Sequence, residues 1–432
     1  MNILLIKPYW PYPYGKGEHT YNRIWPPLSL ANCAAILEQR GHTVAILDAH
    51  ARRIRPRYIA RHIGGYDKIF LTSSSLDRWQ CPNVNMVPFY ETTSALREAG
   101  AGFYVMGYHG TVDAQNVLEQ SGARAVIRGG PEFIVADICA GTPLAQINGV
   151  SYFEGETFRA NPDYGNFELT ELPVPAFHLL DIDKYFYEIL GKRFMLFELG
   201  RGCNFGCKFC NRIMYAPKLR VKTSEQMCEE VRTAVEEHGV KTAYFMDLEF
   251  LHYKNHVSRL CDFLIEKNYN FKWCCQTRAD SVDPDILAKM KQAGCQLIHV
   301  GVESGTKKYL DLTNKSISPE QILEGVSMCR AAGIKTLAFY MFGLKEESED
   351  DRRETFRFAK KLNTNFVSFH KVYPYLKSNV YMPDINFNKY IDNYIRRVYI
   401  QYYLRPEYIW SSDMLTLLRS FRVFMGRLLT LI

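Results

Sequence analysis

The sequence lacks any run of apolar residues long enough to cross a membrane, because no stretch approaches the ~18–20 consecutive apolar residues of a spanning helix. It also lacks a basic, cleavable start, since residues 1–7 form a short apolar segment. Its 12 cysteines follow no regular framework of the kind found in disulfide-rich secreted proteins. We therefore expect a protein that does not cross a membrane and that works in the reducing cytoplasm.

The sequence has little excess of either charge. The net charge is +7 over 432 residues, and a local basic cluster at residues 52–57 is better explained by a solvated turn than by a nucleic-acid patch. We therefore expect no nucleic-acid partner. With 47% hydrophobic and 23% charged residues, the composition is that of an ordinary globular protein, long enough for two or three domains.

Short apolar runs alternate with helical patterns over residues 1–145. The expected strands cover residues 2–7, 43–47, 68–73, 102–106 and 125–128, and the expected helices cover 27–40, 57–63, 84–98 and 112–120. This alternation predicts an α/β fold with a parallel sheet wound on both faces. Ligands of such sheets bind at the carboxyl ends of the strands. Small residues there let a flat or phosphorylated ligand approach the backbone, and they are Ser73, Ser74, Gly107, Gly129 and Gly130.

The pattern changes over residues 146–190, where we expect a hairpin at 149–158 and a proline-rich linker at 172–176. Strand–helix alternation resumes over 191–377. The expected strands cover 194–199, 242–246, 271–276, 297–302, 336–342 and 366–372, and the expected helices cover 224–238, 256–267, 284–293, 319–332 and 350–362. Six strand–helix units predict a partial (β/α)6 barrel, because a complete barrel needs eight.

A loop with three cysteines follows the first strand of this second region. Cys203, Cys207 and Cys210 stand at C-x3-C-x2-C spacing. Thiolates are soft ligands that select iron–sulfur clusters, zinc or cuprous copper. No second C-x2-C pair follows in the sequence, which disfavours a closed structural zinc site, although core thiols and a zinc knuckle remain alternatives. Three cysteines would leave one iron of a 4Fe-4S cluster open to a small molecule.

The spacing, the aromatic Phe209 before the last cysteine and the preceding strand resemble the signature loop of the radical SAM superfamily. The resemblance implies a 4Fe-4S cluster on the three cysteines and S-adenosylmethionine at its open iron. It also implies a small-molecule substrate and an external electron donor, such as flavodoxin or ferredoxin. The implied chemistry is reductive cleavage of S-adenosylmethionine to a 5'-deoxyadenosyl radical that abstracts hydrogen from the substrate.

Polar residues at the ends of the later strands complete the expected site. Asp247 or Glu249 could receive the ammonium group of S-adenosylmethionine, and Arg278 could hold its carboxylate in a two-pronged bond. The resemblance further implies contacts to the methionine and ribose moieties from Gly301, Glu303, Ser304 and Gly305. It also places residues 343–347 near the adenine. His299 lies in mid-strand and is expected to be a core histidine.

Residues 1–145 resemble the cobalamin-binding domain that precedes the radical SAM domain in one branch of the superfamily. One departure is that the loop after the first strand has no histidine to ligate cobalt, and His50 lacks the glycine that would make it a substitute. The resemblance implies bound cobalamin with Trp79, or else Arg78, under the cobalt. Packing between domains is the alternative role for Trp79.

These features predict a cobalamin-dependent radical SAM methyltransferase that acts on an unactivated carbon of a secondary metabolite, lipid or pigment. A non-methylating cyclase or rearrangement enzyme, with or without cobalamin, is the alternative, and the filled strand ends disfavour a non-catalytic iron–sulfur or zinc protein. The sequence identifies no catalytic base or hydrogen donor.

Residues 378–432 are expected to form a helical extension. Its last stretch, 414–431, has an apolar face opposite several arginines. Such a helix docks on its own domain or lies on a membrane surface, and the second alternative would suit a lipid-like substrate.

Overall fold

The computed structural model describes residues 1–10, 23–78, 85–165, 167–210, 212–215, 219–373, 385–410 and 413–414. The chain divides into two compact units. The first comprises Met1–Tyr187, Gly191–Gly202 and Asn211–Thr242, and the second comprises Glu188–Leu190, Cys203–Cys210 and Ala243–Ile432. The predicted domain boundaries at residues 145, 190 and 377 remain predictions.

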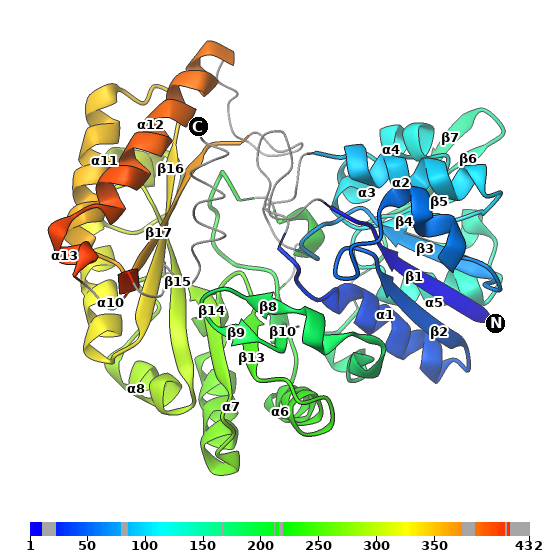
Figure 1. Ribbon diagram of the computed structural model, residues 1–432, viewed down its shortest axis with the longest axis horizontal. Helices are drawn as coiled ribbons and strands as arrows, with labels where there is room; N and C mark the ends of the chain where they lie inside the picture. The colour runs from blue at the N-terminus through cyan, green and yellow to red at the C-terminus, as the bar shows by residue number, and fades with distance from the viewer. Residues whose placement is uncertain are drawn as a thin grey trace. The chain divides into compact units, whose positions relative to one another are not determined.

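The first unit is built on a sheet with the strand order β2-β1-β3-β4-β5-β6-β7 (Figure 1). Its first five members pair in parallel, with Ile3 opposite both Val44 and Lys68. They are β1 (Asn2–Lys7), β2 (Thr43–Asp48), β3 (Lys68–Thr72), β4 (Tyr104–Met106) and β5 (Ala125–Ile127). From β1 the chain adds β2 on one side of the sheet and then β3 on the other. Ligands of such sheets bind at this switch point, between β1 and β3.

Helices cover both faces of this sheet, as predicted. On one face α1 (Leu28–Gln39) packs against α5 (Glu132–Cys139). On the other, α2 (Val87–Glu98) packs against α4 (Ala114–Ser121) and the 3-10 helix η1 (Pro56–His62). The apolar core of that second face joins alternate strand residues such as Leu4, Leu71 and Val105 to Phe89 and Leu96 of α2. The doubly wound α/β fold is therefore confirmed.

The expected hairpin is also confirmed, and it extends the sheet. Strands β6 (Val150–Glu154) and β7 (Thr157–Ala160) pair antiparallel about a turn at Gly155, and β6 pairs antiparallel with β5. The first unit also contains the two strands that precede the cysteine loop, β10 (Phe194–Phe197) and β11 (Gly200–Arg201). The latter pairs antiparallel with β12 (Arg220–Val221).

The second sheet has six strands in the order β10-β13-β14-β15-β16-β17 (Figure 1). The bounds of the last five are β13 (Thr242–Phe245), β14 (Lys272–Thr277), β15 (Cys295–Glu303), β16 (Lys335–Phe342) and β17 (Phe366–Lys371). The strands from β14 to β17 pair in parallel, each with its neighbour in the chain. This sequential order confirms the partial barrel.

Helices connect these strands near the expected bounds: α6 (Ser224–Arg232), α7 (Lys254–Lys267), α8 (Pro284–Gln292), α10 (Pro319–Ala331) and α11 (Glu349–Leu362). Four of them begin at a side-chain cap, from Thr223, Asp283, Ser318 and Ser348. The sequence did not predict a short extra helix between β15 and α10, α9 (Lys307–Leu312).

The predicted helical extension begins with α12 (Ile385–Tyr403), which packs on the edge strand β17. Two tyrosines of α12 form hydrogen bonds with the backbone of that strand. The hydroxyl of Tyr399 accepts a hydrogen bond from the Phe369 N–H at 2.8 Å, and that of Tyr403 accepts one from the Val367 N–H at 3.0 Å. An open sheet edge otherwise exposes unpaired backbone groups, so this helix closes the edge of the partial barrel.

The predicted amphipathic stretch 414–431 lies almost entirely outside the described residues, as does Trp79. Within the described ranges, no helix is both long and apolar enough to span a bilayer.

Candidate functional site

The three cysteines of the motif lie in a loop of the second unit, directly after β11. Cys203, Cys207 and Cys210 are half-buried, and the N–H of Cys210 donates to the carbonyl of Cys207 at 3.2 Å. Of the other described cysteines only Cys228 is also half-buried. Within the described ranges, no three His, Cys, Asp or Glu side chains are grouped so as to hold a metal ion. Ligation by the three cysteines therefore remains a prediction.

A second loop, residues 313–316, holds the cysteine loop in place. The Lys208 N–H donates to the Thr313 carbonyl at 2.9 Å, and the Asn314 side-chain amide donates to the Gly206 carbonyl at 2.9 Å. Asn314 and Ser316 both have a φ of +53°, a conformation that non-glycine residues rarely adopt. Such strain persists only where the surrounding structure enforces it, and it concentrates at functional sites.

Arg278 ties these two loops to the end of β14. Its Nη1 and Nη2 donate to the carbonyls of Lys315 and Ser316 at 2.7 and 3.0 Å, and its guanidinium lies 4.0 Å from the ring centroid of Phe205. Nε and Nη2 also form a two-pronged pair with Asp280, at 2.8 and 2.7 Å. The sequence predicts that this N–H pair binds the carboxylate of a ligand. In the structure the pair binds Asp280 instead, and its contacts give Arg278 a positioning role.

The two predicted carboxylates after β13 are both buried. Glu249 accepts hydrogen bonds from the Thr277 hydroxyl and, at 2.7 Å, from the Arg278 N–H. Burial raises the pKa of Glu249, although these hydrogen bonds oppose the shift. Glu249 therefore joins the ends of β13 and β14, and Asp247 is buried two residues before it.

Glu303 forms a buried ion pair with Lys315 at the end of β15, with 3.1 Å between Oε1 and Nζ. Glu303 has a φ of +66°. A Cβ on Gly301 would lie 2.5 Å from Glu303 Oε1 and 2.7 Å from Lys315 Nζ, so only glycine leaves room for this pair. Burial opposes the lysine charge, but Glu303 and the neighbouring Cys207 outweigh it and raise the pKa of Lys315.

Sequence reasoning missed Lys315. It follows the short helix α9 rather than a strand end, so the reading of strand ends could not find it. Its side chain is nevertheless buried, and its ammonium lies 5.7 Å from the ring of Phe209 in the cysteine loop.

Ser304 and Gly305, also predicted to contact a ligand, pack against α11. The Ser304 hydroxyl lies 3.1 Å from that of Thr355, which also accepts the Gly305 N–H at 3.2 Å. A Cβ on Gly305 would lie 2.4 Å from the Cβ of Phe358. The close approach of α11 accounts for both residues.

His299 is buried in mid-strand, as expected of a core histidine. Its ring lies 5.0 Å from that of Tyr244 and 5.6 Å from that of Phe339, between centroids.

The carboxyl edge of the first sheet carries two serine hydroxyls after β3 that bond to backbone groups at the end of β4. Ser74 Oγ accepts the Tyr108 N–H at 2.8 Å, and Ser73 Oγ donates to the Met106 carbonyl at 3.0 Å. A Cβ on Gly107 would lie 2.7 Å from Ser74 Oγ, so this glycine lets two strand ends approach each other. The structure thus brings three predicted residues together and uses their polar groups internally.

The two glycines after β5 differ from each other. Gly129 has a φ of +76°, and a Cβ there would meet nothing within 4 Å, so the space beside it is open. A Cβ on Gly130 would instead lie 3.0 Å from Glu132 Oε2 and 3.6 Å from Arg201 Nη1. Gly129 therefore leaves room at the edge, whereas Gly130 makes room for buried charges.

Those charges form a cluster of four buried residues, Arg78, Glu132, Glu198 and Arg201. Glu132 Oε1 lies 2.7 Å from Arg78 and 2.6 Å from Arg201, and Glu198 Oε2 lies 3.1 and 2.7 Å from the same two guanidinium groups. Although burial opposes ionisation, the two arginines lower the pKa of Glu132 to about 2. The cluster joins the loop after β3 to the segment that leads to Cys203, and it gives Arg78 a structural role.

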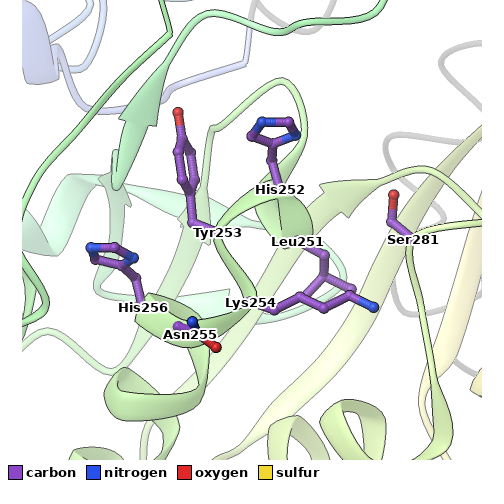
Figure 2. Close-up of a pocket in the computed structure, with 7 residues that line it drawn as sticks. All are labelled: Leu251, His252, Tyr253, Lys254, Asn255, His256 and Ser281. Carbon is purple, nitrogen blue, oxygen red and sulfur yellow. The ribbon is translucent and has the colours of Figure 1, made fainter.

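A pocket of about 510 Å³ opens in the second unit where η8 (Phe250–Tyr253) meets α7, facing Ser281 (Figure 2). His252, Tyr253 and His256 line one side of it, with Tyr253 between the two imidazoles. His252 Nε2 lies 3.2 Å from the side-chain amide nitrogen of Asn204, the residue after Cys203. The pocket therefore adjoins the cysteine loop.

Residues 197–359 match the family model of the Radical SAM superfamily. Residues 197–359 therefore carry a radical SAM domain. Members take a small-molecule substrate and an external reductant.

Two curated relatives and one solved structure resemble the chain over most of its length. An uncharacterized methyltransferase of Pyrococcus horikoshii is 25% identical over 448 residues, covering 94% of this chain and 93% of the relative. The anaerobic magnesium-protoporphyrin IX monomethyl ester cyclase of Rubrivivax gelatinosus is 24% identical over 398 residues, covering 88% of this chain and 69% of the relative. The radical S-adenosylmethionine methyltransferase TsrM from Kitasatospora setae, solved with cobalamin and a 4Fe-4S cluster, matches with a TM-score of 0.67 at 16% identity, over 86% of this chain and 72% of that one. The last comparison shows a shared fold.

Proposed function

We propose that the protein is a cobalamin-dependent radical SAM methyltransferase that acts on an unactivated carbon. The observation that carries the proposal is that a doubly wound sheet precedes a three-cysteine radical SAM domain in the chain. The same pairing is found in the fold of TsrM, which binds cobalamin and a 4Fe-4S cluster, and a relative of nearly equal length is named a methyltransferase.

The residues of the cysteine loop suit a 4Fe-4S cluster. Three thiols lie within one loop of eight residues, all partly accessible, and the ammonium of the buried Lys315 lies 5.7 Å from the ring of Phe209 in the same loop. When bound, the cluster and S-adenosylmethionine supply hydrogen abstraction from the substrate, and cobalamin supplies the methyl group.

The protein's own residues position the cysteine loop and S-adenosylmethionine for this chemistry. Arg278 and the 313–316 loop hold the cysteine loop, while Glu303 and Lys315 present opposite charges at the end of β15. S-adenosylmethionine carries an ammonium and a carboxylate, so the pair suits both ends of its methionine moiety. We assign the carboxylate to Lys315 and the ammonium to Glu303 or Asp247.

The edge of the first sheet suits a large ligand held through backbone and shape. Gly129 leaves open space there, and Ser73, Ser74 and Gly107 form a compact, hydrogen-bonded rim. Trp79, predicted to lie under the cobalt, follows the buried Arg78 in the chain, so the charge cluster anchors the segment that leads to it.

A second candidate function is a radical reaction without methyl transfer. It is favoured by the similarity to the cyclase of Rubrivivax gelatinosus over 88% of this chain. The proposed substrate is a small molecule. A lipid-like substrate, and contact of residues 414–431 with a membrane surface, remain predictions.

The test is anaerobic purification with cluster reconstitution in the presence of hydroxocobalamin. Iron, sulfide and corrinoid are quantified, and S-adenosylmethionine products are followed after addition of a reductant. A cluster with retained corrinoid and 5'-deoxyadenosine formation supports the methyltransferase. A cluster that cleaves S-adenosylmethionine without corrinoid favours the second function, and the absence of any cluster overturns both.

The role assigned to Lys315 has its own test. Lys315→Met should weaken S-adenosylmethionine binding by about tenfold to a hundredfold, because a hydrogen bond between charged groups is worth about 1.5–3 kcal/mol. Binding is measured on the reconstituted protein with Lys307→Met, an exposed lysine of α9, as the matched control. Unchanged affinity in Lys315→Met would refute this role.

A further inference from the structure

We propose that the pocket at the junction of η8 and α7 binds an oxyanion, a carboxylate or phosphate group of the substrate. That the ligand is a substrate rests on the proposed radical SAM function. At about 510 Å³ the pocket has room for such a group together with part of the molecule that carries it. It lies beyond the end of β13, on the edge of the partial barrel where ligands of such folds bind.

The lining of the pocket is rich in hydrogen-bond donors and has no carboxylate. Over the apolar Leu251 it consists of His252, Tyr253, Lys254, Asn255, His256 and Ser281. All six can donate a hydrogen bond, and the lysine adds a positive charge. A lining of this kind complements an oxyanion and disfavours a cationic ligand.

The lysine charge is only partly engaged. Lys254 Nζ pairs with Asp283 at 2.7 Å, with both side chains more than 40% exposed. Exposed pairs of this kind contribute little to stability, so a ligand anion can draw the ammonium into the pocket at small cost. Figure 2 shows the Lys254 side chain extending toward the Ser281 side of the pocket.

The two histidines do not form a metal pair. His252 and His256 are four residues apart, a spacing that can chelate zinc on a helix. Here the Tyr253 ring lies between them, with centroid separations of 5.3 Å and 6.2 Å. In the described part of the chain they belong to no group of three metal-ligating side chains. Separated imidazoles flanking a phenol suit several oxygen atoms of one ligand better than a single ion.

The pocket is placed to serve the reaction. His252 contacts Asn204, which directly follows the first cysteine of the motif. An anionic group held by this lining would tether a substrate beside the cysteine loop and leave the rest of the molecule free to reach the reacting centre. Fixing a substrate through a remote group in this way is a common means of orienting it.

The test is site-resolved protection of histidines in the reconstituted full chain. Diethyl pyrocarbonate modification of His252 and His256 is followed by mass spectrometry with inorganic phosphate, with succinate, or with chloride at equal ionic strength. The exposed His62 of the first unit serves as the internal control. At nine-tenths occupancy, phosphate or succinate should slow modification of both pocket histidines by roughly tenfold, without an effect at His62. The stronger of the two probes identifies the oxyanion as a phosphate or a carboxylate.

Lys254→Ala should raise the probe concentration needed for protection by about tenfold, because it removes a charged donor. Lys272→Ala, an exposed lysine outside the pocket, is the matched control and should leave it unchanged. Absence of protection, equal protection by chloride, or an unchanged Lys254→Ala variant would overturn the site. Protection in a protein that fails to cleave S-adenosylmethionine would sustain the oxyanion site and reject the proposed function.

Discussion

The two sheets of this protein carry different chemistry at the carboxyl ends of their strands. The first edge presents hydroxyls and glycines after β3, β4 and β5. Its charges are buried in ion pairs, namely Lys7 with Asp48 and the cluster of Arg78, Glu132, Glu198 and Arg201. The second edge brings the charged Glu249, Arg278, Glu303 and Lys315 up to the cysteine loop.

The difference indicates two ways of binding a cofactor. Neutral hydroxyls and open backbone suit a large ligand recognised by shape, as proposed for cobalamin. Opposite charges in a buried setting suit a zwitterion such as S-adenosylmethionine, because interactions between charges are stronger away from water. Function at the first edge should therefore tolerate polar substitutions, whereas function at the second should depend on single groups.

The largest expected effect is on the second edge. Cys207→Ala should abolish cleavage of S-adenosylmethionine and leave the fold intact, because a partly accessible thiol of a loop contributes little to packing. Cleavage is measured as 5'-deoxyadenosine after anaerobic reconstitution and reduction. Cys228→Ala is the matched control, since Cys228 is equally half-buried but burial raises its pKa to about 11 and makes it a poor ligand. Cleavage that survives in Cys207→Ala would remove the basis of the proposed function.

The next largest effect concerns the buried cluster beneath the first edge. Arg201→Met leaves Glu132 and Glu198 buried with one guanidinium fewer, which should reduce the free energy of unfolding of the first unit by about 3–5 kcal/mol. Pulse proteolysis in urea measures this free energy. The control is Arg232→Met on the surface of α6, where the three ion pairs are solvent-exposed and no measurable change is expected. Equal stability of the two variants would show that the buried cluster contributes no more than a surface network.

Much of this comparison could be predicted from the sequence, because strands and helices follow from local apolar periodicity and the cysteine loop from its spacing. What could not be predicted depends on contacts between distant residues. Arg78 and Glu198 meet across 120 positions, and no local pattern indicates that either is buried. For the same reason the sequence predicts a ligand contact at Gly130, although the space beside it holds Glu132 and Arg201.

The second edge shows the same limit at shorter range. The sequence predicts that Arg278 follows the end of β14, as it does, but its contacts with Asp280 and with the 313–316 loop depend on how that loop folds back. Lys315 could have been found only by asking which cation is able to reach a buried Glu303.

A buried carboxylate of the second unit should make stability depend on pH. Burial raises the pKa of Glu347 to about 7, although the Gly343 N–H and Arg352 oppose the shift. Because its folded pKa exceeds the unfolded value near 4.5, its favourable contribution is complete below pH 4.5 and is lost as the pH rises through 7.

Glu347→Gln removes this ionisation. Relative to the natural protein, the variant should gain up to about 3 kcal/mol in free energy of unfolding between pH 4.5 and pH 8, since one pKa unit corresponds to about 1.4 kcal/mol. Urea unfolding at both pH values gives the difference. The exposed Glu349 provides the control variant Glu349→Gln, which should show no such gain. A pH-independent difference for Glu347→Gln would mean that folding does not raise the pKa of Glu347.

The smallest effect tests the first edge directly. Ser74→Ala removes the acceptor of the Tyr108 N–H in a buried setting, which should cost about 1 kcal/mol of stability in the first unit. Because the hydroxyl is already used within the protein, the variant should retain corrinoid as well as the natural protein does. Ser94→Ala on α2, whose hydroxyl meets only a long, exposed contact of 3.4 Å from Arg97, is the control for stability. If Ser74→Ala instead lost corrinoid at unchanged stability, the hydroxyl would contact the ligand, and the first edge would depend on single polar groups as the second does.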